Sequence, residues 1–197
     1  GNEKILICGS PKSKEGWRHV PLPQAQHQLS IYLGDKGFLN PRFSREGDQL
    51  IVWSGPQTKI HHLEVQGASG ELLDPSKKRK IVGYSLEPSR LDEVHSWADT
   101  RLRYSGYACP QVSVHANAWN GNVVATVDAG LQQKIASLQQ MGLDSFEPSA
   151  LSRYQAFNVG ELYDARKTQL TVARMLADGL IQSANFEAQC RQDQVAL

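Results

Sequence analysis

The sequence has few cysteines, no long apolar run and little net charge. Its three cysteines, Cys8, Cys109 and Cys190, are odd in number and widely spaced, so no disulfide framework or metal-ligand pattern is legible. No stretch approaches the roughly 18 apolar residues of a membrane-spanning helix, and the apolar residues 5–8 are too few for a signal-peptide core. A net charge of +1 does not indicate a broad electrostatic attraction to nucleic acid or anionic lipid, and we expect no nucleic-acid partner.

A phrase that recurs along the chain is the strongest feature present. A helical pattern ends in glycine followed by an aromatic residue, a β-hairpin pattern follows, and a second glycine closes it. These glycines are Gly37 and Gly55 in the first occurrence and Gly106 and Gly130 in the second, an offset of about 69 to 75 residues. Repetition at this period predicts small modules in tandem.

The most complete module spans residues 58–130. Residues 59–67 have the pattern of a short strand, and Asp74 followed by proline is typical of a helix start. Residues 88–105 place apolar side chains three and four apart, which predicts an amphipathic helix that ends at Gly106. A hairpin over 111–128 follows. The predicted order is strand, helix, helix, strand, strand, in an α+β fold.

The modules on either side are predicted to be incomplete. In residues 1–57 the opening strand is either Lys4–Cys8 with an abbreviated helix or is missing, because the prolines within 10–23 favour a loop. In residues 131–197 a short helix is expected from Glu147, interrupted by Gly160, and a longer helix is expected over 163–178, capped by Gly179. Residues 183–190 are expected to form one strand, so this module would lack its last strand.

These units resemble POTRA domains of the BamA/TamA superfamily of outer-membrane β-barrel proteins. The closest correspondence is Phe157-Asn158-Val159-Gly160-Glu161-Leu162-Tyr163-Asp164, a long helix, and then Gly179-Leu180-Ile181, where the family typically ends in glycine and two aromatic residues. Three such units are most similar to the TamA branch. The resemblance covers nearly the whole chain and implies a three-stranded mixed sheet packed against two helices in each unit.

The resemblance also implies a role. It predicts the periplasmic portion of an outer-membrane protein, without enzymatic activity or cofactor, that binds client proteins for assembly or translocation. The implied partners are unfolded outer-membrane proteins or secreted clients, an accessory assembly subunit, and a C-terminal β-barrel in the full-length protein. An alternative with the same fold is the POTRA region of a two-partner-secretion transporter.

The candidate binding site is an exposed sheet edge in the middle unit. Such an edge presents unpaired backbone groups to which an extended client segment can add a strand. In the family the first hairpin strand commonly lies at this edge, and Trp119 beside the turn is a further interaction candidate. The predicted partner-binding residues are Gln111, Val112, Ser113, Val114, His115, Ala116 and Trp119, and the predicted structural glycines are Gly37, Gly55, Gly106, Gly130, Gly160 and Gly179.

An alternative from another class is a small hydrolase or metal protein built on Cys109 and the histidines. No third group that would orient a nucleophile and base is visible, so we interpret Cys109 as an inert thiol. His61 and His62 are consecutive on an expected strand and point to opposite faces, so we interpret them as surface residues. The four basic residues 77–80 are interpreted as a solvated helix face, with docking to lipid or a partner as the alternative.

Overall fold

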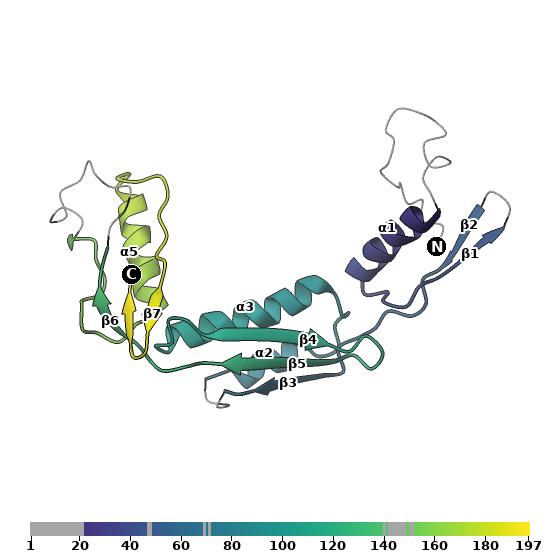
Figure 1. Ribbon diagram of the computed structural model, residues 1–197, viewed down its shortest axis with the longest axis horizontal. Helices are drawn as coiled ribbons and strands as arrows, with labels where there is room; N and C mark the ends of the chain where they lie inside the picture. Colours follow the sequence, from purple (N-terminus) through teal and green to yellow (C-terminus); the bar gives the residue numbers. More distant parts are fainter. Residues whose placement is uncertain are drawn as a thin grey trace. The chain divides into compact units, whose positions relative to one another are not determined.

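The computed structural model describes residues 22–46, 49–68, 70, 72–139, 141, 149 and 152–197 (Figure 1). Among these residues the strands form one two-stranded and two three-stranded sheets. This combination of helices and short sheets confirms the predicted α+β class. The elements are α1 (Leu22–Asp35), β1 (Arg42–Glu46), β2 (Gln49–Trp53), β3 (His62–Gln66), α2 (Pro75–Ile81), α3 (Pro88–Tyr104), β4 (Gln111–Ala116), β5 (Asn122–Asp128), β6 (Lys134–Ser137), α5 (Ala165–Ala177), β7 (Gln189–Arg191) and β8 (Gln194–Ala196).

The chain divides into two compact units. One comprises the described residues within 1–64, 77–93 and 115–124, and the other comprises 65–76, 94–114 and 125–197. The elements β3, α2, α3, β4 and β5 therefore contribute to both units. The division into repeats at 57/58 and 130/131 stays a prediction, and we use the names first, middle and third repeat for those ranges.

Helix α1 ends in a glycine cap that recurs later in the chain. Ala25, Leu29 and Leu33 are buried at four-residue spacing, so one face of α1 is apolar. The Phe38 N–H donates to the Leu33 carbonyl over 2.9 Å, and Gly37 has a φ of 81°, a left-handed conformation that glycine adopts at low cost. The same bond ends α3 at Gly106, from Tyr107 to Leu102, and α5 at Gly179, from Leu180 to Met175. The recurring phrase is thus one capping motif used three times.

The first repeat continues into an antiparallel ribbon. Strands β1 and β2 pair in register from Arg42 opposite Trp53 to Glu46 opposite Gln49, as the hairpin pattern predicts. The predicted strand 4–8 and most of the predicted loop 10–23 lie outside the described residues. The last two residues of that loop, Leu22 and Pro23, instead begin α1, because proline is tolerated in the first turn of a helix.

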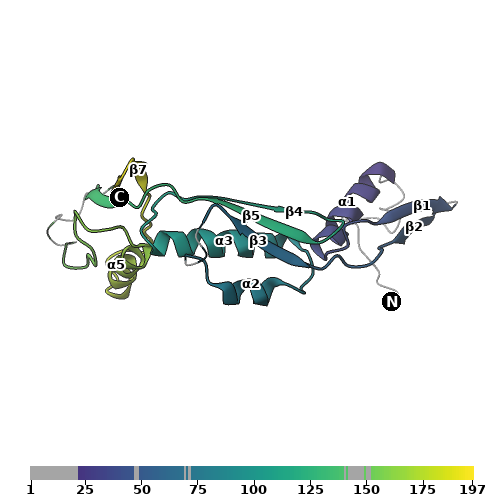
Figure 2. The same ribbon diagram turned by 90° about the horizontal axis from the view of Figure 1, so that it is seen from below.

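The middle repeat contains a sheet in the order β3-β5-β4. Val123, Ala125 and Val127 alternate along β5 and are buried, while the intervening residues are more exposed. Figure 2 shows α2 and α3 on one face of this sheet, which explains the one-sided burial. Helix α2 begins as predicted, because the Asp74 carboxylate accepts a hydrogen bond from the Ser76 N–H over 2.9 Å.

The third repeat contains a complete three-stranded sheet in the order β6-β8-β7. Strand β8 pairs in parallel with β6 and antiparallel with β7. The prediction that this module lacks its last strand is therefore wrong, as is the single strand over 183–190. The hairpin strands are only three residues long, and their turn contains Gln192 with a φ of 54°, so neither a strand pattern nor a glycine marks them in the sequence. Most of the short helix expected from Glu147 lies outside the described residues.

A first junction lies around Gly37 and Thr58. The Thr58 N–H donates to the carbonyl of the cap residue Gly37 over 2.9 Å, and the Thr58 carbonyl accepts from the Leu86 N–H over 2.7 Å. The half-buried Thr58 hydroxyl donates to the Ala118 carbonyl in the β4–β5 turn over 3.1 Å. Thr58 thus connects the preceding helix cap, the segment before α3 and the hairpin turn of its own repeat.

A second junction, around Gly106 and Gln133, repeats this pattern. The Gln133 N–H donates to the Gly106 carbonyl over 3.0 Å, and the Gln133 carbonyl accepts from the Tyr163 N–H over 2.9 Å. The buried Gln133 side chain accepts from the Ala108 N–H over 2.7 Å and donates to the Gln192 carbonyl over 3.4 Å. Each junction lies within one compact unit. The two junctions therefore share individual backbone hydrogen bonds as well as a sequence pattern.

None of the described helices is long and apolar enough to cross a membrane.

Candidate functional site

Strand β4 lies at one edge of the middle sheet, with β5 as its neighbour. Val112 and Val114 are half-buried and alternate with exposed residues, so the strand presents one face to the protein and one to solvent. The outward backbone side of β4 pairs with no described strand. All six residues predicted for the edge lie in β4: Gln111, Val112, Ser113, Val114, His115 and Ala116.

The β4–β5 turn holds Trp119 in an exposed position, where 84% of its surface is accessible. The Asn117 side chain accepts from the Trp119 N–H over 2.9 Å and from the Asn120 N–H over 3.3 Å. Asn120 in turn accepts from the Asn122 N–H over 3.0 Å. Asparagine side chains favour such turns because they bond to the backbone two residues on. A shallow depression adjoins the turn, lined by His115, Ala116, Asn117, Ala118, Trp119, Asn120, Asn122 and Val124.

The turn is also fastened to the segment that precedes β3. The His61 N–H donates to the Gly121 carbonyl over 3.0 Å, in addition to the bond from Thr58 to the turn. A side chain at Gly121 would collide with the Lys59 carbonyl, and the φ of 66° also favours glycine there. The backbone of the turn is thus hydrogen-bonded at Ala118 and at Gly121, on either side of Trp119 in the sequence.

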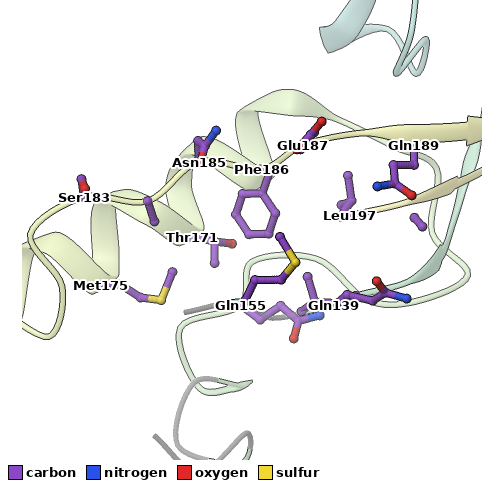
Figure 3. Close-up of a pocket in the computed structure, with 14 residues that line it drawn as sticks. Gln139, Gln155, Thr171, Met175, Ser183, Asn185, Phe186, Glu187, Gln189 and Leu197 are labelled. Carbon is purple, nitrogen blue, oxygen red and sulfur yellow. The ribbon is translucent and has the colours of Figure 1, made fainter. Parts of the chain in front are cut away.

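A second edge strand, β7, lies in the third repeat beside a cavity of about 370 Å³. Figure 3 shows the Phe186 ring and the Thr171 and Gln155 side chains around this cavity. Phe186 also contacts Phe157 edge to face, with ring centroids 5.5 Å apart. The segment before β7 is therefore held by side-chain packing, and the sequence contained no signal for this cavity.

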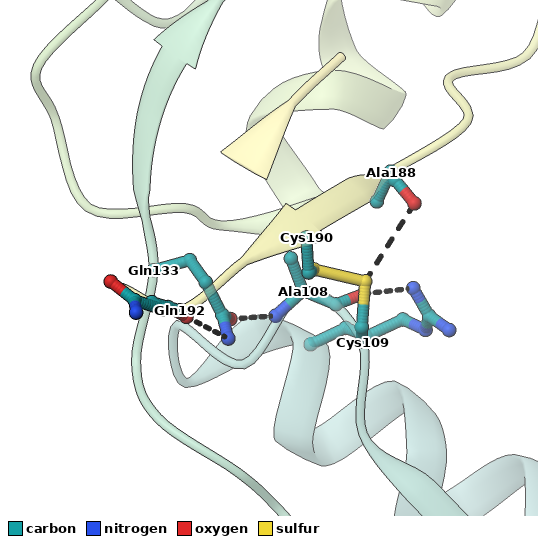
Figure 4. The surroundings of a disulfide bond; sticks show 7 residues. Ala108, Cys109, Gln133, Ala188, Cys190 and Gln192 are labelled. Atoms are coloured by element: carbon teal, nitrogen blue, oxygen red, sulfur yellow. Dashed lines mark hydrogen bonds between the residues drawn. A yellow bond between two sulfur atoms is a disulfide. The ribbon is translucent and has the colours of Figure 1, made fainter. Parts of the chain in front are cut away.

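A disulfide joins Cys109 to Cys190, with the Cα atoms 6.3 Å apart (Figure 4). The Cys109 sulfur lies 3.6 Å from the Ala188 carbonyl oxygen, a contact without a donated hydrogen because a disulfide has no S–H. This corrects the interpretation of Cys109 as an inert thiol. It also removes the thiolate that the hydrolase alternative needs, because only a thiolate is the nucleophile.

His61 and His62 are exposed, and among the described residues no group of three or more metal-binding side chains converges. In the basic run 77–80, Arg79 and Lys80 are exposed, whereas Lys77 and Lys78 are half-buried. Lys77 pairs with Glu93 at 2.5 Å, and Arg90 pairs with the same carboxylate at 2.8 Å. These hydrogen bonds, first from Lys77 and then from Arg90, lower the pKa of Glu93.

The loop before α5 carries a second charged cluster. Asp164 caps α5 by accepting from the Arg166 N–H over 2.9 Å, and the Arg166 guanidinium lowers the pKa of this carboxyl. Hydrogen bonds from Lys167 and then Asn158 lower the pKa of Glu161 to about 2. Both clusters organise helix starts and lie outside the β4 edge.

All six glycines predicted to be structural have positive φ values. Gly106 also has little space for a side chain, because a Cβ there would lie 3.1 Å from the Leu162 side chain. The values are 81° for Gly37, 72° for Gly55, 99° for Gly106, 65° for Gly130, 91° for Gly160 and 67° for Gly179.

The middle repeat, with two helices on one face of a three-stranded sheet and a hairpin whose first strand is an edge, has the arrangement predicted for a POTRA domain. No family model matches the sequence, and no curated protein matches it. Solved structures do match. The crystal structure of Haemophilus influenzae BamA POTRA3-5 is similar at a TM-score of 0.64 and 18% identity, covering 88% of this chain and 78% of that chain.

A second similar structure is BamA from Haemophilus ducreyi lacking POTRA domains 1-3. Its TM-score is 0.55 at 18% identity, over 70% of this chain and 28% of that chain. The predicted POTRA fold is therefore confirmed. The preference for the TamA branch stays a prediction.

Proposed function

We propose that this chain is a periplasmic arm of an outer-membrane assembly or translocation protein, and that it binds extended segments of other polypeptides on β4. The observation that carries the proposal is the position of this six-residue strand at a sheet edge. An added strand would gain main-chain hydrogen bonds with little demand on its sequence. The bound polypeptides would be unfolded outer-membrane proteins, secreted clients or an accessory subunit.

Three further observations support the proposal. The two solved structures described above are parts of BamA. The exposed Trp119 stands beside the edge on a preorganised turn, and tryptophan is enriched at binding hot spots. The disulfide fits an oxidising compartment such as the bacterial periplasm. The function proposed here is non-enzymatic, because it uses backbone pairing and surface contact.

Photocrosslinking from matched positions on the two hairpin strands tests the proposal. A photoreactive residue replaces Ser113 on the edge strand β4 in one variant and Thr126 on the interior strand β5 in the other; both residues are exposed. We expect the Ser113 variant to capture an unfolded outer-membrane protein segment, and the Thr126 variant to capture far less.

A competitor peptide tests the mode of binding. A client peptide should compete for crosslinking, whereas the same peptide methylated on alternate backbone nitrogens should not, because strand addition needs those donors. Equal capture from both positions, or equal competition by both peptides, would contradict strand addition at β4.

A further inference from the structure

The disulfide joins the segment just before one edge strand to the middle of another edge strand. Cys109 lies two residues before β4 begins at Gln111, and Cys190 is the central residue of β7. Strands β4 and β7 are edge strands of their respective sheets. The covalent bond therefore connects the start of the proposed binding strand to the edge of the third repeat's sheet.

The contacts around the disulfide can hold this region together without it. Ala108, next to Cys109, is buried in a cluster with Ile135, Phe157 and Val195. Beside the cluster, the buried Gln133 accepts from the Ala108 N–H. Opening the disulfide would therefore release a covalent restraint on a junction that is also packed and hydrogen-bonded, so the opened form should stay folded.

The two cysteine residues differ in exposure. Cys109 is exposed, whereas Cys190 is half-buried and packs against the buried cluster. Thiol–disulfide exchange depends on access to the attacked sulfur. An incoming thiolate therefore reaches the Cys109 sulfur, and Cys190 is the leaving group.

We propose that Cys109 is a site of thiol–disulfide exchange with a dithiol oxidoreductase, and that this exchange joins or releases the start of β4 and the strand β7. A thiolate of the reduced enzyme attacks the Cys109 sulfur, the Cys109–Cys190 bond breaks, and Cys190 leaves as a thiolate that takes up a proton. The second thiolate of the enzyme attacks the mixed disulfide and releases the Cys109 thiolate, which is protonated. The chain gains two electrons and two protons, and the enzyme is oxidised to its disulfide.

The site of attack is tested with glutathione as a monothiol probe. The protein carries Cys8→Ser, so that only Cys109 and Cys190 remain, and is treated without denaturant. Peptide mapping by mass spectrometry should find the glutathione adduct on Cys109. Adducts found mainly on Cys190, or a disulfide that opens only in denaturant, would overturn the assignment.

Release of the start of β4 and of β7 is tested by amide hydrogen exchange before and after reduction with dithiothreitol. Exchange in 108–112 and 189–191 should become about 10- to 100-fold faster, since a disulfide restrains local opening on that scale. The amides of Thr58 and Leu86 at the first junction should be unchanged and serve as an internal control. The Cys109→Ser/Cys190→Ser variant should reproduce the reduced pattern. Unchanged protection in both segments would overturn the release.

The consequence for client binding rests on the proposed function. Crosslinking from Ser113 should differ between the oxidised and reduced protein, because the start of β4 is restrained in only one of them. Equal crosslinking in the two states would overturn the link between exchange and client binding. Absence of crosslinking in both states would overturn the proposed function, while the adduct and exchange measurements would still decide whether Cys109 is attacked and the strands released.

Discussion

At the first junction the half-buried Thr58 forms hydrogen bonds to a helix cap and to a hairpin turn. At the second junction Gln133, with 5% of its surface exposed, occupies the equivalent position. Thr58 makes one side-chain hydrogen bond in that setting, whereas the Gln133 amide makes two, and the Cys109–Cys190 disulfide lies next to it. The backbone bonds are the same. The difference teaches that the repeat specifies its backbone geometry, while the side chains set how firmly each junction is held.

The largest expected effect comes from removing the disulfide. It closes a loop with a sequence separation of 81 residues. Cys109→Ser/Cys190→Ser should lower the free energy of unfolding by about 2 to 4 kcal/mol, because the unfolded chain regains the entropy of that loop. Urea denaturation measures the change. Dithiothreitol should produce a similar loss in the parent protein and none in the variant, and equal stability of both proteins would contradict a stabilising bond.

Gln133→Ala compared with Thr58→Ala tests the side chains of the two junctions. Gln133→Ala leaves the buried Ala108 N–H without its acceptor, so we expect a loss of about 1 to 3 kcal/mol. Thr58→Ala removes one part-buried hydrogen bond and should cost about 0.5 to 1.5 kcal/mol. The free energy of unfolding of both variants should be measured with the disulfide intact. A larger loss at Thr58 would reverse the comparison.

Gly106→Val compared with Gly130→Val separates backbone conformation from space. Both glycines have positive φ, which costs a side chain about 1 kcal/mol or more. At Gly106 a Cβ also meets Leu162 at 3.1 Å, whereas nothing lies within 4 Å at Gly130. The melting temperature should fall in both variants and further for Gly106→Val. An unchanged melting curve for Gly106→Val would refute the helix-cap assignment.

The smallest effect concerns acid stability at the second junction. Hydrogen bonds from Lys167 and Asn158 lower the pKa of Glu161 from 4.5 to about 2. A lowered pKa in the folded state stabilises the protein above the unfolded-state pKa, and this contribution is lost as the pH falls through the folded-state value. The equivalent residue at the first junction is Tyr84, which has no carboxylate. Its carbonyl accepts from the Ile60 N–H, as the Glu161 carbonyl accepts from the Ile135 N–H.

Melting curves of the parent protein and Glu161→Gln, recorded between about pH 2 and pH 6, measure this contribution. The parent should be the more stable protein above about pH 4.5, and the difference should shrink towards about pH 2. A difference that is constant with pH would show that the ionised carboxylate is not its source.

Local patterns in the sequence predicted the local structure well. The helix α3, its cap at Gly106 and the hairpin β4–β5 follow from apolar spacing, glycine and an asparagine-rich turn, each of which acts over a few residues. The edge position of β4 came from the family resemblance, because strand order is a property of the whole sheet. The hairpin β7–β8 was missed because its strands are short and Gln192 is an unusual turn residue.

Contacts between distant residues could not be predicted in this way. Cys109 and Cys190 lie far apart in the sequence, and three cysteines allow several pairings. In the sequence, nothing distinguishes Gln133 from a polar residue on the surface, although the folded chain buries it. Its burial depends on the Gly106 cap and on the turn at Gln192, neither of which is adjacent to it in the sequence.

The bonds from Thr58 to Gly37 and from Gln133 to Gly106 have a consequence for the order of folding. In both cases the acceptor carbonyl belongs to the residue that caps the preceding helix, so it is correctly oriented only after that helix has ended. The end of one repeat is therefore the template for the start of the next. Since a chain emerges from the ribosome from its N-terminal end, we expect each finished repeat to guide the assembly of its successor during synthesis.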